Sequence, residues 1–284
     1  MTEEKSKWVK YGSIFAIIIM LGSAVLFMTM FTNDSPDKAT PVDFTIKNAK
    51  DGVNYLPEGV LNIEIIKIYP NDEISVSLNN SFPGVTFDKV MVGSYENGIL
   101  RYYSVKEGSK KPVMSGNPTY ETYNGYSIAI ESNQHAIVGN PLIIASGDNT
   151  LSRKIINILN KNSTSSTNFN DILSYADDTE IYEQIRVSKT SEGSNFSKYY
   201  QRTSQYENGT IQLETIVLNP TQSMKDDIAA FAGSSTENVT VTVTENGPAV
   251  KIYIDSADFI SYATKTNELY NLTIKNVVLE NSTA

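Results

Sequence analysis

Clustered carboxylates are the residues with which this chain could bind a metal or cleave a bond. The densest group, Asp177, Asp178, Glu180 and Glu183, lies where a short predicted helix leads into a strand. Carboxylate oxygens suit Ca²⁺, although the EF-hand spacing with its central glycine is missing, and paired carboxyl groups can hydrolyse a glycoside. Acidic residues on an edge strand also commonly face solvent. The four residues are therefore candidate metal ligands, with an ordinary surface role as the alternative.

A second acidic pair, Asp255 and Asp258, flanks Ser256 after a later predicted strand. A hydrolase that used clustered carboxylates would bring this pair and the 177–183 group within about 5–10 Å of each other in a concave pocket. Their convergence or separation would thus distinguish an enzyme from a binding protein.

Other catalytic signatures are missing from the sequence. There is one histidine, His135, and no cysteine, so a zinc site would need several carboxylates, and we expect His135 to be structural or solvated. No nucleophile elbow, phosphate loop or dinucleotide fingerprint occurs, and a Ser-x-x-Lys match at Ser35 falls in a polar segment beside Pro36. We expect no catalytic residue and no cofactor, which makes an enzyme the less favoured class.

Eight Asn-x-Ser/Thr triplets could carry N-linked glycans outside a cell. Their acceptors are Asn33, Asn79, Asn162, Asn195, Asn208, Asn238, Asn271 and Asn281. Chance in a sequence rich in Asn, Ser and Thr is the alternative explanation. Tyrosine is also abundant, with 17 residues, many of them within 102–126 and 199–206. Exposed tyrosines can bind sugars or proteins, but we favour cross-strand packing.

An uncharged run extends from Gly12 to Phe31. Twenty helical residues at 1.5 Å each span about 30 Å, the thickness of the hydrocarbon core of a bilayer. Three lysines precede the run and Asp34 is the first charge after it, which leaves the N-terminus in the cytoplasm. A cleaved signal peptide fits less well because its apolar region is shorter.

This anchor sets the predicted domain organisation and location. We expect a cytoplasmic tail at 1–11, a transmembrane helix at 12–31, a stalk at 32–41, and two ectodomain lobes at 42–165 and 166–284. The protein would be a single-pass protein of the cell membrane with its C-terminal part extracytoplasmic. A net charge of −9 makes nucleic acid an unlikely partner, and without cysteine the ectodomain has no disulfide.

Short alternating or β-branched runs predict an α+β ectodomain with a largely antiparallel sheet. Strands are predicted at 63–69, 74–78, 90–95, 99–105, 126–131, 142–145, 181–187, 211–218, 239–243 and 250–254. Glu-Asn-Gly at 96–98, 207–209 and 245–247 predicts hairpins with type I′ turns, in which both central residues have positive φ.

Apolar stripes predict helices at 151–160, 170–176, 219–232 and 257–270. Asp148 or Asn149 would cap the first of these. Asn219 would be the N-cap of the third, with Pro220 in the first helical position.

The two lobes echo each other in sequence. Tyr-Glu-Asn-Gly occurs at 95–98 and again at 206–209, 111 residues later. At nearly the same offset, the strand pair within 126–146 corresponds to that within 239–254. Two copies of one unit would explain this echo, and so would chance recurrence of Asn-Gly hairpins, because the helix at 219–232 has no counterpart in the first half.

The run GYSIAIESNQHAIVGNPLIIASGDNTLSRKIINIL at 125–159 leads from a strand pair into a helix after Ser-Gly-Asp. It resembles a recurring segment of uncharacterised membrane-anchored ectodomain proteins of prokaryotes, including methanogen surface proteins. The resemblance implies an anchor with a two-lobed α+β ectodomain, and it brings no catalytic residue.

Three classes of function follow. We favour a non-enzymatic binding or scaffold protein, or a cell-envelope accessory protein, with a protein or glycan partner at the cell surface. The alternative is a membrane-anchored hydrolase that uses the clustered carboxylates. A structural subunit of an envelope assembly would show a contiguous apolar patch or a long uncovered strand edge.

Overall fold

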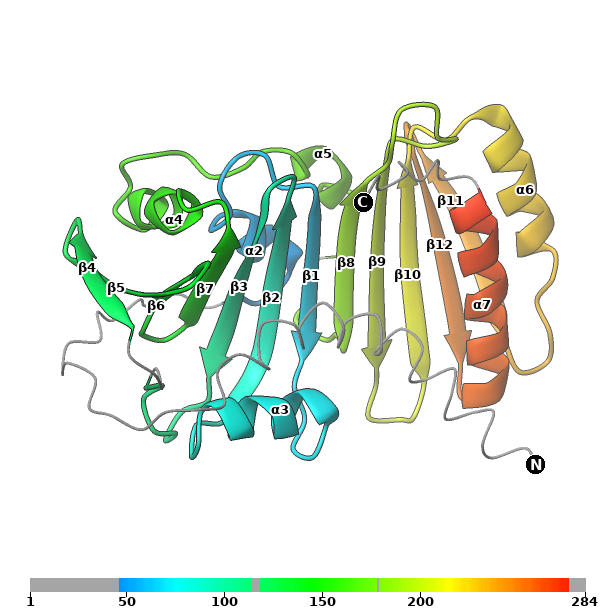
Figure 1. Cartoon of the computed structure of the whole chain (residues 1–284). Coiled ribbons are helices and arrows are strands. Elements are labelled where there is room, and N and C mark those ends of the chain that lie inside the picture. The colour runs from blue at the N-terminus through cyan, green and yellow to red at the C-terminus, as the bar shows by residue number, and fades with distance from the viewer. Residues whose placement is uncertain (1–45, 114–117, 178, 276–284) are drawn as a thin grey trace. The chain divides into compact units, whose positions relative to one another are not determined.

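The structure is a computed structural model that describes residues 46–113, 118–177 and 179–275. This part is a largely antiparallel β-sheet protein with several helices, which confirms the α+β class (Figure 1). The predicted tail, transmembrane helix and stalk at 1–41 lie outside the described residues. Within the described ranges, no helix is both long and apolar enough to cross a bilayer.

The described chain forms two compact units. Unit 1 contains Ile46, 51–60 and 65–166, and unit 2 contains 47–50, 61–64 and the chain from Thr167 onward. Unlike the predicted lobes, the units therefore exchange two short segments. Helix α2 (Ala49–Val53) and strand β1 (Asn62–Lys67) each contribute residues to both units.

Unit 1 is built on the antiparallel strand order β2-β3-β7-β6-β5-β4. Its strands are β2 (Phe87–Tyr95), β3 (Gly98–Val105), β4 (Thr119–Tyr123), β5 (Tyr126–Glu131), β6 (Gln134–Ile137) and β7 (Leu142–Gly147). Its helices are α3 (Glu73–Ser81) and α4 (Leu151–Leu159).

Both faces of this sheet are apolar. On one face the rings of Phe82, Phe87 and Tyr103 meet edge to face, with centroid distances of 5.7 Å for Phe82–Phe87 and for Phe87–Tyr103. Helix α4 packs on the other face, because Ser152 contacts His135, which pairs with Ala145 on the side opposite Tyr103.

Unit 2 repeats this plan with the antiparallel order β11-β12-β10-β9-β8. Its strands are β8 (Gln184–Lys189), β9 (Lys198–Gln205), β10 (Ile211–Leu218), β11 (Thr240–Asn246) and β12 (Ala249–Ser256). Its helices are α5 (Asn170–Leu173), α6 (Gln222–Ala232) and α7 (Phe259–Lys275).

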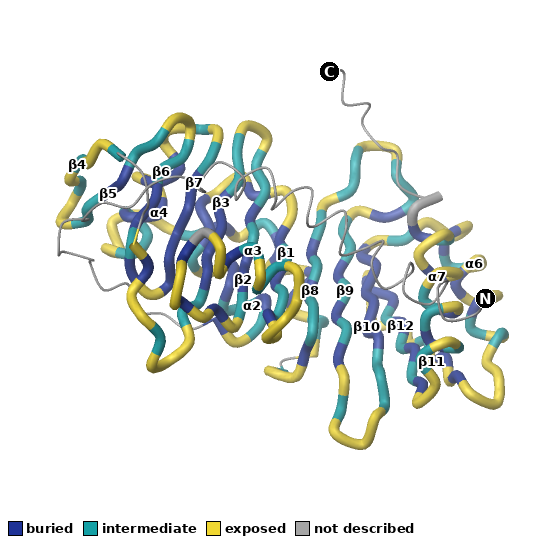
Figure 2. The backbone as a smooth tube through the Cα atoms, turned by 60° about the horizontal axis from the view of Figure 1, so that its bottom comes forward, coloured by how far each residue is buried: buried dark blue, intermediate teal, exposed yellow. Residues whose placement is uncertain are grey.

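The two faces of the unit 2 sheet differ. Helices α6 and α7 cover one face, where residues such as Leu213, Ile252 and Phe231 form an apolar core (Figure 1). Helix α5 and the segment that follows it pack against the other face. In each unit, Figure 2 shows buried positions concentrated in the strands and exposed positions in the connecting turns.

One predicted strand was wrong. Residues 74–78 belong to helix α3, although Ile74 and Val76 are β-branched. Ile74, Leu78 and Phe82 are spaced at i, i+4 and i+8, and all three contribute to the core of unit 1. Burial of this stripe against the sheet outweighs the local β-propensity. Strands β4, β6 and β9 were not predicted.

Hairpins form at all three Glu-Asn-Gly triplets, but the predicted turn type was wrong. Gly209 and Gly247 have positive φ (83° and 58°), whereas their preceding asparagines do not. Both central residues have positive φ at Asn124 and Gly125 (47° and 85°), which connect β4 to β5. The type I′ geometry therefore occurs at an Asn-Gly pair that the prediction passed over.

The predicted helix caps were displaced. Helix α6 begins at Gln222, and its N-cap is Thr221, whose Oγ1 accepts from the Met224 N–H at 3.3 Å. Asn219 has φ 52° and its N–H donates to the Pro248 carbonyl, so it ends the strand region instead of starting the helix. Thr150 is the N-cap of α4, and Asp148 accepts from its N–H and hydroxyl at 2.8 and 2.7 Å.

Helices α5 and α7 also differ from their predicted bounds of 170–176 and 257–270. Helix α5 is a single turn that ends at Leu173. Helix α7 begins later and continues to Lys275.

Candidate functional site

The described acids of the 177–183 group, Asp177, Glu180 and Glu183, have separate surroundings. Glu180 is exposed and pairs with Lys47 at 3.4 Å, and the Glu183 N–H donates to the Thr203 carbonyl at 2.7 Å as strand β8 approaches. Asp178 lies outside the described residues. Asp177 turns instead toward the sheet of unit 2. Within the described ranges, no group of three or more His, Asp or Glu side chains is placed to hold a metal ion.

The second acidic pair is also engaged in structure. Asp258 lies just before α7, and its Oδ2 accepts from the Ser261 N–H at 3.0 Å. The side-chain and backbone hydrogen bonds from Ser261 lower the pKa of Asp258. Asp255 accepts from Gln212 Nε2 at 2.8 Å. Asp255 and Asp258 therefore have separate partners.

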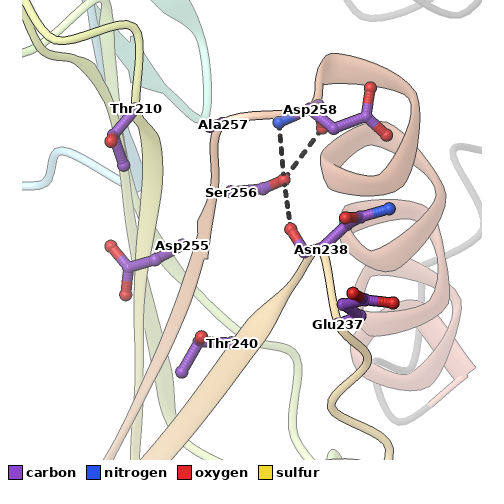
Figure 3. A pocket seen from close by; sticks show the side chains of 8 residues that line it. All are labelled: Thr210, Glu237, Asn238, Thr240, Asp255, Ser256, Ala257 and Asp258. Atoms are coloured by element: carbon purple, nitrogen blue, oxygen red, sulfur yellow. Dashed lines mark hydrogen bonds between the residues drawn. The ribbon is translucent and has the colours of Figure 1, made fainter.

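A polar pocket of about 460 Å³ lies beside this pair, between the end of β12 and the start of α7 (Figure 3). Its lining residues are Thr210, Glu237, Asn238, Thr240, Asp255, Ser256, Ala257 and Asp258. The Ser256 hydroxyl donates to the Asn238 carbonyl at 2.7 Å and accepts from the Asp258 N–H at 3.0 Å. In Figure 3 the carboxylates of Glu237 and Asp258 point away from that of Asp255. The lining thus offers hydrogen bonds but no facing carboxylate pair.

Four charged side chains meet on the face of the unit 2 sheet that lies away from α6 and α7. We call Asp177, Arg202, Glu214 and Lys251 the ionic cluster. Arg202 Nε lies 3.0 Å from Glu214 Oε2, and Lys251 Nζ lies 3.3 Å from Glu214 Oε1. Asp177 contacts both cations, with 3.1 Å from its Oδ1 to Lys251 Nζ and 3.4 Å from its Oδ2 to Arg202 Nη2. Two positive and two negative charges therefore balance.

Strand register brings three of these residues together. Glu214 of β10 lies opposite Arg202 of β9, and Lys251 is two residues from Tyr253, which lies opposite Glu214 on β12. Because side chains alternate along a strand, all of them project to the face away from α6 and α7. Asp177 reaches the same place from the segment after α5, and its N–H donates to Glu214 Oε1 at 3.2 Å.

Burial governs the electrostatics of the ionic cluster. The Glu214 and Arg202 side chains are 0% and 2% exposed, against 14% for Lys251 and 46% for Asp177. Desolvation raises the pKa of Glu214, with Arg202 opposing the shift. Burial would lower the pKa of Lys251, but hydrogen bonds to Tyr253 and Asp177 and the Glu214 charge raise it overall.

Gln212 connects the ionic cluster to Asp255. Its Oε1 accepts from the Tyr206 hydroxyl at 3.0 Å and from Arg202 Nη2 at 3.5 Å, while its Nε2 binds Asp255. The Nη1 of Arg202 has no hydrogen-bond partner among the described residues. The two predicted acidic regions are therefore linked through an amide and a guanidinium, and they do not share a pocket.

Sequence reasoning found Asp177 but missed Arg202, Glu214 and Lys251. One signal was available, because Glu214 interrupts the apolar run Ile211–Leu218 at a position where a buried strand would carry an apolar residue. Its partners come from strands that are distant in sequence, and only the strand register shows that they meet.

The other candidates have structural or surface roles. His135 Nδ1 lies 3.1 Å from Ser152 Oγ. Tyr102, Tyr103 and Tyr200 are buried, whereas Tyr120 is exposed. These positions show that cross-strand packing accounts for part of the tyrosine content.

The acceptor residues for glycosylation lie in different settings. Asn79, Asn162, Asn208, Asn238 and Asn271 are exposed, Asn195 is half-buried, and Asn33 and Asn281 lie outside the described residues. Thr273 of the Asn271 triplet is buried, and its hydroxyl donates to the carbonyls of its own helix. Asn162, Asn208 and Asn238 lie in connecting segments.

Comparisons with known proteins leave the family open. No protein-family model matches the chain, and no curated protein matches it. A solved structure, crystal form I of TP0453, is similar with a TM-score of 0.45 and 8% sequence identity, covering 75% of this chain and 96% of that one. This similarity is too low to carry an argument about function.

Proposed function

We propose that this protein is a single-pass membrane protein whose acidic extracytoplasmic part is a non-enzymatic binding or scaffold component of the cell envelope. The observation that carries the proposal is the state of the carboxylates. Among the described residues singled out in the sequence, the carboxylates of Asp177, Glu180, Asp255 and Asp258 have separate structural partners. Glu214, whose pKa burial raises, is 0% exposed and beyond the reach of a substrate. An ordinary glycosidase needs two carboxyl groups that flank one bound substrate.

The location in this proposal rests on the sequence. The uncharged run 12–31 is long enough to span a bilayer, and the lysines before it orient the remainder outward. A net charge of −9 suits a soluble surface domain with a protein or glycan partner, and it disfavours nucleic acid.

A subunit that polymerises through its strand edges fits the structure less well. Edge strand β4 has only five residues. At the other edge, β11 is partly closed, because Ser235 Oγ accepts from the Val241 N–H at 3.0 Å and donates to its carbonyl at 3.4 Å. Short or covered edges are how sheet proteins avoid edge-to-edge pairing.

The proposal is tested first by topology in the cells that make the protein. The full chain should stay with membranes through salt and alkaline washing, and protease added to intact cells should digest the part after residue 31. Protection of that part, or release by salt, would refute the proposed location.

Binding is tested by chemical crosslinking in intact cells, followed by purification of the full chain. A reproducible partner should persist when an unrelated transmembrane helix replaces 12–31, and it should be lost when 42–284 is replaced behind the natural anchor. Turnover of a glycan or peptide by the purified full chain, abolished by Asp255→Asn, would favour the hydrolase instead.

A further inference from the structure

A lysine, an aspartate and a buried glutamate meet in the ionic cluster. Lys251 Nζ lies 3.1 Å from Asp177 Oδ1 and 3.3 Å from Glu214 Oε1. Asp177 Oδ2 also accepts from the Tyr253 hydroxyl at 3.2 Å, so both carboxylate oxygens are held. An amine and a carboxyl group are thus fixed side by side, with a second carboxyl group touching the amine.

We infer that Lys251 and Asp177 become joined by an isopeptide bond inside the folded chain, with Glu214 carrying the proton between them. This inference does not depend on the proposed function. It assigns the ionic cluster a covalent modification that the protein performs on itself.

The reaction balances without any further reagent. Lys251 gives a proton to Glu214, and the free Nζ attacks Cγ of Asp177 to form the C–N bond. Glu214 returns the proton to a departing Asp177 oxygen, which leaves as water with the second proton lost from the nitrogen. An ammonium and a carboxylate become one amide and one water, with no change in oxidation state.

Three features of the site favour this step. Fixed neighbours react as if present at about 10⁵–10⁸ M when their geometry is right, which offsets the low reactivity of a carboxylate. Burial of Glu214 raises its pKa, which suits a group that must accept a proton and release it. The side chain of Asp177 is 46% exposed, so the water that forms has a path to solvent.

The charges that remain after the reaction are still paired. Bond formation removes one positive and one negative charge, and it leaves Arg202 beside Glu214 at 3.0 Å. The raised pKa of Lys251 opposes loss of its proton while the ion pairs last. Transfer to Glu214, which is in contact with Nζ, moves that proton without separating charge across solvent.

Two other lysine–carboxylate pairs among the described residues provide a contrast. Lys198 lies closer to its partner Asp171, at 2.6 Å, but its Nζ also donates to the Asn168 carbonyl, which does not accept a proton. Lys225 lies 2.7 Å from Glu245, whose side chain is 60% exposed. If proximity alone were sufficient, these pairs would react as well.

The bond would tie the segment between α5 and β8 to strand β12 in a chain that has no cysteine. A link that closes a long loop stabilises chiefly by restricting the unfolded chain. We therefore expect its loss to lower the melting temperature by roughly 10 °C.

The test is mass spectrometry on the purified full chain after proteolysis. We expect a branched peptide in which the segments containing Asp177 and Lys251 are joined, lighter than their sum by one water molecule. Lys251→Arg keeps the charge but cannot form the amide, and Glu214→Gln keeps the shape but cannot carry the proton, so both variants should yield separate peptides.

The matched control is Glu245→Gln, which removes one carboxylate from a lysine pair outside the ionic cluster and should leave the branched peptide intact. Separate peptides from the folded wild-type chain would overturn the inference without recourse to any variant. A branched peptide that persists in Glu214→Gln would overturn the role of Glu214, and one that joins Lys198 to Asp171 would show that proximity suffices.

Discussion

The two units fill the same position in opposite ways. In unit 1, Tyr103 at the centre of β3 lies opposite Val90 and Leu142 on its two neighbouring strands. In unit 2, Glu214 at the centre of β10 lies opposite Arg202 and Tyr253. Both rows project to the face away from the helix that follows the last strand of the unit. The row in unit 1 has no charged side chain, whereas the row in unit 2 contains the buried pair Arg202 and Glu214.

The two units share a strand order and its connections. Strands β2-β3-β7-β6 and β9-β10-β12-β11 have the same connections, and helices α4 and α7 follow them. In unit 1 the hairpin β4–β5 connects β3 to β6, and in unit 2 helix α6 makes the corresponding connection from β10 to β11. Duplication of one unit would give this correspondence, and that duplication stays a prediction.

A sheet with this strand order therefore does not require the ionic cluster. At the equivalent position unit 1 has Tyr103 between Val90 and Leu142, a row without a charged side chain. Buried ion pairs often contribute no more to stability than well-packed apolar residues of similar size, because removing charges from water is costly. The contacts that the ionic cluster makes with Asp177 therefore explain it better than a need for stability does.

Removing one charge from the ionic cluster should have the largest effect. Arg202→Met leaves Glu214 buried without its nearest cation, and we expect the free energy of unfolding of unit 2 to fall by about 3–5 kcal/mol. Hydrogen exchange of β9 and β10 peptides measures this change. All cluster variants are best compared in a Lys251→Arg background, which excludes any covalent link. Unchanged protection would show that the cluster is solvated.

Removing a ring that packs beside Tyr103 in unit 1 should lower stability nearly as much. Phe87→Ala removes a ring that contacts both Phe82 and Tyr103, and the cavity should destabilise unit 1 by about 3 kcal/mol. Exchange of β2 and β3 peptides gives the measurement. Val76→Ala, at a residue that is 53% exposed, is the control and should change little. Equal effects of the two substitutions would contradict the described core.

The stability of unit 2 should depend on pH through the titration of Glu214. The pKa of this group is raised in the folded state, so the folded chain binds the proton more tightly than the unfolded chain. Stability from this group is present at pH below about 4.5 and is lost as pH rises through the folded pKa, with a slope of at most about 1.4 kcal/mol per pH unit. Glu214→Gln should remove that slope in denaturation curves measured across this range.

Substitutions at the helix N-caps should lower stability by a smaller amount, and the loss should differ between α6 and α4. Thr221→Ala removes the hydrogen bond to the Met224 N–H and should destabilise α6 by about 1 kcal/mol. Thr150, the N-cap of α4, makes no side-chain bond to its helix, so Thr150→Ala should cost less. Melting temperatures of the two variants check the order. A larger loss for Thr150→Ala would mean that its bond to Asp148 matters more than the cap.

Replacing both Arg202 and Glu214 with apolar residues should have the smallest effect on stability. In the same Lys251→Arg background, Arg202→Met with Glu214→Leu removes both members of the buried pair. We expect stability within about 1 kcal/mol of the background, far from the loss in Arg202→Met alone. Hydrogen exchange and circular dichroism provide the comparison. A double variant as unstable as the single one would show that unit 2 needs its charges to fold.

Local sequence pattern predicted much of the sheet but little of the ionic cluster. Alternation placed the strands at 126–131 and 211–218 with the bounds that β5 and β10 have. Asn-Gly pairs located the hairpins, because their signal is contained in a few neighbouring residues. The segment at 74–78 was misread, since its helical stripe includes Phe82, beyond the apparent strand.

The ionic cluster could not be predicted in the same way. Its four residues come from four segments of unit 2, and their meeting depends on strand register and on the path of the chain after α5. Glu214 was visible as an anomaly within an apolar strand. Nothing local indicated that Asp177 faces it, because acidic residues in a connecting segment are ordinarily solvated.

The hydroxyl of Ser235 has a consequence for self-association at high local concentration. It contacts the Val241 N–H and carbonyl, the same two groups that an incoming strand would use. The Ser235 side chain thus makes the hydrogen bonds that the backbone of an added strand would make at Val241. Copies of the chain that meet at this edge are thereby kept from pairing strand to strand into a fibre.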